Sequence, residues 1–207
     1  MASSHTARGL DRLLFFSDAT VAIAITLLIL PSVDFASEIA HTSLGTLLGD
    51  HWTTLLALVV SFAVIGNLWL AHHQLFELMA DYNYGLAWLN LLWLLSIVLI
   101  PFSTSVLANA PSGDRAVYAL YIGTIVVSSG TMVLMRVVLR RHPELMRPEA
   151  RGELRLAHSL VPTTILALAL VLAELVPQVG ISWLFLLLLT EPADRVIDRV
   201  QRRRGTP

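Results

Sequence analysis

A few polar side chains lie inside long apolar stretches of this sequence, and they are the first candidates for chemistry. The set comprises Ser17, Asp18, His72, His73 and Asn90. An aspartate at the centre of a membrane-spanning helix costs roughly 2.5 to 3.5 kcal/mol on insertion scales. Such groups persist where they pair with one another, or where they serve the passage of ions or protons.

Two interpretations of these polar residues stay open from the residues alone. In the structural one, buried polar groups pair because an unpaired one is costly. In the functional one, they support a gate or hinge, or relay protons, with His72 beside Asp18 acting as a pH switch. His72 and His73 point about 100° apart on a helix, which makes them a poor metal pair. We therefore predict no metal site.

Motifs that would indicate an enzyme, or a channel with a carbonyl filter, are missing from the sequence. It has no TVGYG-type carbonyl filter, no P-loop, no H-E-x-x-H and no serine nucleophile elbow. It has no cysteine, which excludes thiolate chemistry and disulfides. The sequence thus predicts a protein that is not an enzyme and that has no resident cofactor.

The composition indicates which elements carry these residues. Hydrophobic residues make up 56% of the chain and charged ones 14%, against roughly 25% charge in soluble domains; the mean hydropathy is +0.70. A spanning helix needs about 17–25 apolar residues. We predict an all-α membrane protein with a single six-helix transmembrane domain over residues 1–207. Residues 195–207 of this domain form a cytoplasmic tail. The predicted helices are 13–31, 52–76, 82–110, 115–138, 156–174 and 178–194.

The first predicted helix could also be read as a secretory signal, because Arg8 and Arg12 precede its apolar run. Asp18 within that run, and Asp34 three residues before the one plausible cleavage position, oppose this reading. We expect a retained helix.

The arginines predict the orientation. All fourteen basic residues are arginine, and all but Arg115 lie in the N-terminal segment, the 136–155 connection or the 195–207 tail. Positive charge favours the cytoplasmic side, so both termini are expected there, in a multi-pass protein of the plasma membrane. The tail arginines are expected to anchor to membrane lipids, and no nucleic-acid partner is predicted.

Helical rise places several polar residues at one depth. Asp18 lies about 8 Å inside the first predicted helix, and the antiparallel course of the next two brings His72 and Asn90 to similar depths. Ser17 belongs to the same layer, and Arg12 lies at its cytoplasmic rim. We expect these residues to meet.

The outer half of the first helix carries an aliphatic stripe. Its members recur at i, i+3, i+4 and i+7, namely Ile23, Thr26, Leu27 and Leu30. Asp18 lies about 140° around the helix from Ile23. On periodicity alone the stripe faces lipid or packs against protein, and Pro31 ends or bends the helix. In the third helix, Pro101 predicts a kink. Proline leaves one backbone carbonyl without its helical hydrogen bond, and nearby hydroxyl side chains can donate to that carbonyl.

Three strings of residues resemble the transmembrane protein 175 family, which comprises lysosomal potassium channels and their bacterial relatives. The first is Arg12-Leu-Leu-Phe-Phe-Ser-Asp18, followed by Ala22-Ile-Ala-Ile-Thr-Leu-Leu-Ile-Leu30. The second is Trp69-Leu-Ala-His-His73, and the third combines Leu89-Asn90 with Ile100-Pro-Phe-Ser-Thr104. The resemblance covers about residues 12–105.

This resemblance implies a potassium-permeable channel that assembles as a homotetramer around the first helix, with K⁺ as the permeating ion. It implies a pore constriction at Ile23, Leu27 and Leu30. It also implies a helix-1 motif network of Arg12, Phe16, Ser17 and Asp18, supported by Trp69, His72 and Asn90. Pro31 stands where many bacterial members have an acidic residue, and Ala22 offers the ion no hydroxyl. The aliphatic stripe would then face a pore instead of lipid.

Two rival functions use the same sequence. A proton-coupled secondary transporter would use Asp18, His72 and Glu174, and it predicts saturable flux without unitary currents. A non-transporting scaffold predicts no flux. We find no inverted repeat and no signal of an unwound half-helix, which counts against the transporter.

Overall fold

The computed structural model describes residues 7–111, 114–150, 163–164 and 167–168, and within them it is built of helices. Four segments there are long and apolar enough to cross a membrane, namely Arg8–Ala40, Trp52–Glu77, Tyr84–Asn109 and Arg115–Arg141. Each lies where the sequence predicts a span. The predicted helices 156–174 and 178–194 and the tail 195–207 fall outside the described residues, apart from the short pieces 163–164 and 167–168.

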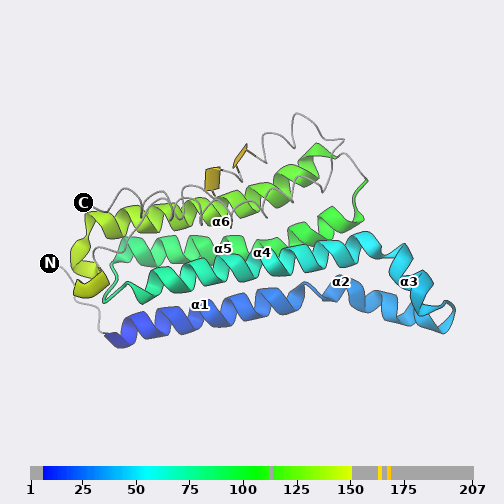
Figure 1. The fold of residues 1–207 in the computed structure, drawn as a ribbon, viewed down its shortest axis with the longest axis horizontal. Helices are drawn as coiled ribbons and strands as arrows, with labels where there is room; N and C mark the ends of the chain where they lie inside the picture. The colour runs from blue at the N-terminus through cyan, green and yellow to red at the C-terminus, as the bar shows by residue number, and fades with distance from the viewer. Residues whose placement is uncertain (1–6, 112–113, 151–162, 165–166, 169–207) are drawn as a thin grey trace, which may run out of the picture.

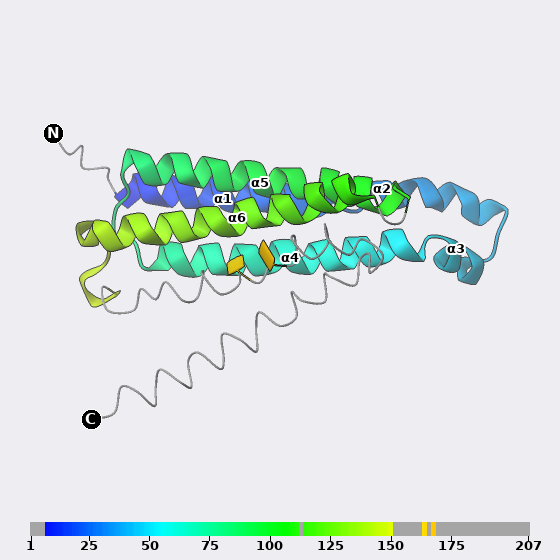
Figure 2. The same cartoon turned by 90° about the horizontal axis from the view of Figure 1, so that it is seen from above.

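The long helices run side by side as an elongated bundle (Figure 1). They are α1 (Ala7–Leu27), α4 (Trp52–Glu77), α5 (Tyr84–Asn109) and α6 (Arg115–Arg141). Helix α5 is central: it packs most extensively against α6 and also contacts α1 and α4. Helix α1 also contacts α4, and short elements connect the two helices at the end of the bundle opposite the start of α1 (Figure 2). These are α2 (Leu30–Val33), the 3₁₀ segment Asp34–Ala40 and α3 (Leu44–Asp50).

Helix α1 differs from the prediction at both ends. It begins at Ala7 instead of residue 13, and it ends at Leu27 instead of residue 31. Proline lacks an N–H and its ring clashes with the carbonyl four residues earlier. For Pro31 that residue is Leu27, which explains where the regular helix stops. Leu30 therefore lies on the separate short helix α2.

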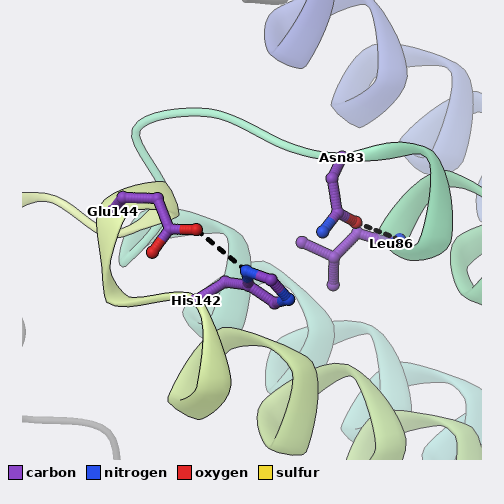
Figure 3. Close-up of polar contacts among 4 residues, drawn as sticks. All are labelled: Asn83, Leu86, His142 and Glu144. Atoms are coloured by element: carbon purple, nitrogen blue, oxygen red, sulfur yellow. Dashed lines mark hydrogen bonds and ion pairs between the residues drawn. The ribbon is translucent and has the colours of Figure 1, made fainter. Parts of the chain in front are cut away.

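Side-chain caps fix the starts of α5 and α6. The Asn83 side-chain oxygen accepts a 2.9 Å hydrogen bond from the Leu86 N–H (Figure 3), and Asp114 Oδ1 accepts one of 3.0 Å from the Ala116 N–H. Each bond satisfies a backbone donor that the first helical turn leaves unpaired. Helix α5 runs unbroken through Pro101. The hydroxyls of Ser103 and Thr104 bind the Ile100 carbonyl.

Two loops meet at the end of the bundle where α1 begins and α6 ends. The Ala80 N–H donates to the Leu145 carbonyl at 2.8 Å, and the Arg147 N–H donates to the Leu78 carbonyl at 3.0 Å. Figure 3 shows His142 on one of these loops, paired with Glu144 at 2.8 Å. The bonds tie the connection after α6 to the turn between α4 and α5.

Candidate functional site

Ser17 starts a chain of hydrogen bonds that joins three helices. Its hydroxyl donates to the Leu13 carbonyl at 2.8 Å and accepts from the Asn90 side-chain nitrogen at 2.9 Å. The Asn90 oxygen lies 2.8 Å from His72 Nε2. Because that oxygen only accepts, Nε2 of His72 carries the proton. Ser17, Asn90 and His72 are all fully buried, and the chain links α1, α5 and α4 by direct hydrogen bonds.

Aromatic rings enclose His72. Its ring stacks on Trp93 at a centroid distance of 4.0 Å and on Phe76 at 4.2 Å. Nδ1 of His72 is buried and has no hydrogen-bond partner within the described part of the chain. The packing fixes the imidazole plane and aims Nε2 at Asn90.

Asp18 has a partner of its own on α4. Trp69 Nε1 donates to Asp18 Oδ1 at 2.8 Å. An indole N–H is a donor only, and the carboxyl oxygen of Asp18 accepts from it. Asp18 is partly buried, whereas its neighbour Ser17 is wholly so. The two adjacent residues thus brace α1 against α4 and α5 through separate contacts. We call these contacts, among Ser17, Asp18, Trp69, His72 and Asn90, the polar brace.

Two residues expected in this network lie apart from it. Arg12 is exposed, and no hydrogen bond or ion pair joins it to the polar brace within the described residues. Phe16 is 55% exposed. Successive residues on a helix point about 100° apart. Arg12 and Phe16 therefore share the exposed side of α1, while Ser17 turns to the buried side.

The aliphatic stripe lies on that same exposed side. Ile23 is 60% exposed, Leu27 39% and Leu30 55%. The Thr26 hydroxyl donates to the Ile23 carbonyl at 2.8 Å, so it is occupied by its own helix. The opposite side of the same stretch is packed, with Val21, Ala24 and Leu28 all buried. Within the protomer, the stripe is free to face another molecule.

The adjacent histidines do not converge. His73 Nε2 lies 3.4 Å from Glu77 Oε1, one turn along α4, and its ring stacks on Trp69. Among the described residues there is no group of three or more histidines, cysteines or carboxylates that could hold a metal. His72 and His73 thus have different neighbours, as their spacing predicts.

A second buried polar cluster was not predicted. The Thr104 and Ser61 hydroxyls lie 2.8 Å apart, and Ser61 lies 2.9 Å from the Tyr121 hydroxyl. All three side chains are buried, and they come from α5, α4 and α6. We call them the hydroxyl cluster. The sequence signal for this cluster is the presence of hydroxyl residues in otherwise apolar spans. Which of them meet depends on how each helix is rotated, because the partners lie far apart along the chain.

Known proteins share this pattern of helices and motifs. Residues 12–101 match the family model described as endosomal/lysosomal potassium channel TMEM175. A potassium channel of Streptomyces collinus is 43% identical over 105 residues, covering 49% of this chain and 48% of that protein. A potassium channel of Chamaesiphon minutus is 38% identical over 95 residues, covering 45% and 47%. The chain thus spans about half the length of these relatives.

A solved structure extends the likeness to the fold. The crystal structure of a lysosomal potassium-selective channel TMEM175 homologue from Chamaesiphon minutus superposes with a TM-score of 0.56 at 25% identity. The match covers 87% of this chain and 97% of that one. It confirms the all-α, multi-pass membrane fold predicted from the sequence. The matched proteins are named channels, in line with a chain predicted not to be an enzyme. Residues 12–101 of the chain are thus similar to the TMEM175 family.

Proposed function

We propose that the chain forms a potassium-preferring cation channel, a homotetramer in which α1 lines a central pore. The observation that carries the proposal is the two-sided character of α1. One side is held by the polar brace, and the other presents Ile23 and Leu27 to the outside of the protomer, as Leu30 is on α2. Homologues named potassium channels match this segment.

Fourfold symmetry would turn each exposed side chain into a ring. Four Ile23 side chains around an axis would leave an opening too narrow for a fully hydrated ion, with Leu27 and Leu30 forming wider apolar rings toward the outside. Such a constriction acts as a dewetting barrier and as a size filter. It offers no carbonyl ligands to replace water, so its selectivity should be weaker than that of a carbonyl filter. A closed ring of subunits also places a pore naturally on the symmetry axis.

The polar brace would set the position of this ring. Asp18 lies about 140° around α1 from Ile23, and it bonds to Trp69 on α4. The carboxylate is thus directed into the protomer and not toward the proposed axis. Its role in this proposal is to hold α1 at a fixed rotation.

The charges support a cell-membrane protein with cytoplasmic termini. The start of α1, with Arg8 and Arg12, and the end of α6, with Arg140 and Arg141, lie at the same end of the bundle (Figure 1). Arg147 lies on the loop beside them. Such clustering is typical of the cytoplasmic face. Membrane lipids would contact the remaining apolar helix surfaces.

Ion flux from liposomes holding the purified protein tests the proposal, with potassium, sodium and protons compared in separate experiments. We expect passive potassium flux with unitary currents. Replacing Ile23 with Asn should raise the sodium-to-potassium permeability ratio several-fold, because a polar ring admits partly hydrated ions. An unchanged ion preference in the Ile23→Asn variant would remove Ile23 from the filter.

The proton-coupled transporter is less well supported. Its two central residues have different partners, since Asp18 bonds to Trp69 and His72 bonds to Asn90. Its third residue, Glu174, lies outside the described residues. Saturable, proton-driven flux without unitary currents would favour it over the channel.

A further inference from the structure

We infer that Phe16 is a second pore-lining residue, two helical turns to the cytoplasmic side of Ile23. The inference rests on the proposed channel function and deepens it. It concerns a side chain that the motif groups with Ser17 and Asp18, whereas the structure turns it to the opposite side of α1. The ligand is the permeating cation itself.

Phe16 lies on the same side of α1 as Ile23. Seven residues separate it from Ile23, which is about 20° short of two full turns and about 10 Å along the axis. The two side chains therefore lie almost in line on α1. They are also similarly exposed in the protomer, at 55% for Phe16 and 60% for Ile23. Whatever Ile23 faces in the assembled protein, Phe16 faces too.

The neighbours of Phe16 fix that direction. Ser17 is bound to Asn90 within the protomer, so rotation of α1 that buried Phe16 would break this bond. The Phe16 carbonyl accepts a 2.8 Å hydrogen bond from the Thr20 hydroxyl, one turn farther along the helix. Asp18, bonded to Trp69, limits rotation in the other direction. The polar brace thus points Phe16 outward as firmly as it points Ile23.

Between the two large side chains, α1 presents a small one. Ala19 is exposed and lies about 40° from the line of Ile23. With Phe16 and Ile23 as rings on an axis, the lumen would widen at Ala19 into a chamber. An ion could keep its water there and lose it at the rings. The faces of the Phe16 rings would also attract a cation electrostatically.

Phe15 provides a matched control. It is the same residue type, it is next in sequence, and it is 68% exposed. It points about 100° away from Phe16 around the helix. If α1 faced lipid, neither side chain would lie beside the path of the ion. In a pore lined by Phe16, only Phe16 lies there.

The accessibility of introduced cysteines tests the inference. No native thiol can react with the reagent, because the chain has no cysteine of its own. The variants are Phe16→Cys, Ala19→Cys and the control Phe15→Cys, each in the full-length protein in planar bilayers. A water-soluble cationic methanethiosulfonate is applied from the N-terminal side while the potassium current is recorded. We expect loss of most of the current in Phe16→Cys and Ala19→Cys, and an unchanged current in Phe15→Cys.

Two results would overturn the inference. One is an unchanged current in Phe16→Cys while labelling of the protein by mass shows that the thiol reacted. The other is an equal loss of current in Phe15→Cys and Phe16→Cys. Ala19→Phe gives an independent readout: filling the chamber should abolish conduction, and full conduction would also contradict a pore at this face. Absence of potassium current from the unmodified protein would instead overturn the proposed function, so the two failures are distinguishable.

Discussion

The N-terminal half of α1 and its C-terminal half are held in different ways. The N-terminal half is bonded to its neighbours through Ser17 and Asp18, which reach Asn90 and Trp69. The C-terminal half contacts the bundle through apolar side chains such as Val21 and Ala24, and the regular helix stops at Leu27. Hydrogen bonds fix a rotation, whereas apolar contacts tolerate small rotations. The contacts of the N-terminal half of α1 therefore set the direction of the exposed stripe.

The hydroxyl cluster sharpens this contrast. Its three side chains are buried, as are Ser17, His72 and Asn90 of the polar brace, and they join α4, α5 and α6. Helix α1 contributes no residue to it. Changes in the hydroxyl cluster should therefore affect stability alone, while changes in the polar brace should affect both stability and ion flux.

The largest effect is expected for Asn90→Ala. This change removes the central member of the chain between Ser17 and His72, leaves the His72 N–H without an acceptor and opens a small cavity. We expect a loss of about 3 kcal/mol in the free energy of unfolding, with reduced potassium flux. Thermal unfolding in detergent, followed by circular dichroism, measures the first effect. Unfolding at the original temperature would show that the buried bonds contribute little.

Trp69→Phe should have a smaller effect. It keeps an aromatic ring in place but removes the N–H that donates to Asp18. A hydrogen bond to a charged group contributes about 1.5 kcal/mol or more, and Asp18 is only partly buried. We expect the free energy of unfolding to fall by about 1.5 kcal/mol, together with altered ion flux. Flux equal to that of the unchanged protein would separate Asp18 from the positioning of α1.

Tyr121→Phe should have the smallest effect. It removes one hydroxyl from the hydroxyl cluster, and Ser61 keeps its hydrogen bond with Thr104. We expect a loss of about 1 kcal/mol in stability and unchanged potassium flux per assembled channel. It serves as the control for Asn90→Ala, and a change in selectivity here would end the proposed division of roles between the two clusters.

Much of the architecture follows from simple geometry. Runs of apolar residues locate the spans, and the rise per residue predicts that Ser17, His72 and Asn90 meet at one depth, as the structure shows. The helical angle between Asp18 and Ile23 likewise predicts that they face different ways. These inferences succeed because each depends on position along or around a single helix.

Other features depend on how helices pack, and the sequence does not reveal them. Ser61, Thr104 and Tyr121 lie far apart in the chain, and they meet only because three helices adopt particular rotations. Phe16 stands beside Ser17 in the motif, which suggests a shared role until the 100° between neighbours is taken into account. The end of α1 at Leu27, earlier than predicted, follows from the clash of the Pro31 ring with the Leu27 carbonyl.

The central claim is that the stripe of Ile23, Leu27 and Leu30 faces a symmetry axis. A density map of the purified protein, assembled in a lipid nanodisc, tests it most directly. The account predicts four copies around a central axis, with Ile23 from each copy pointing at that axis and Phe16 two turns below it. A map in which these side chains face the acyl chains of the surrounding lipid would contradict the account.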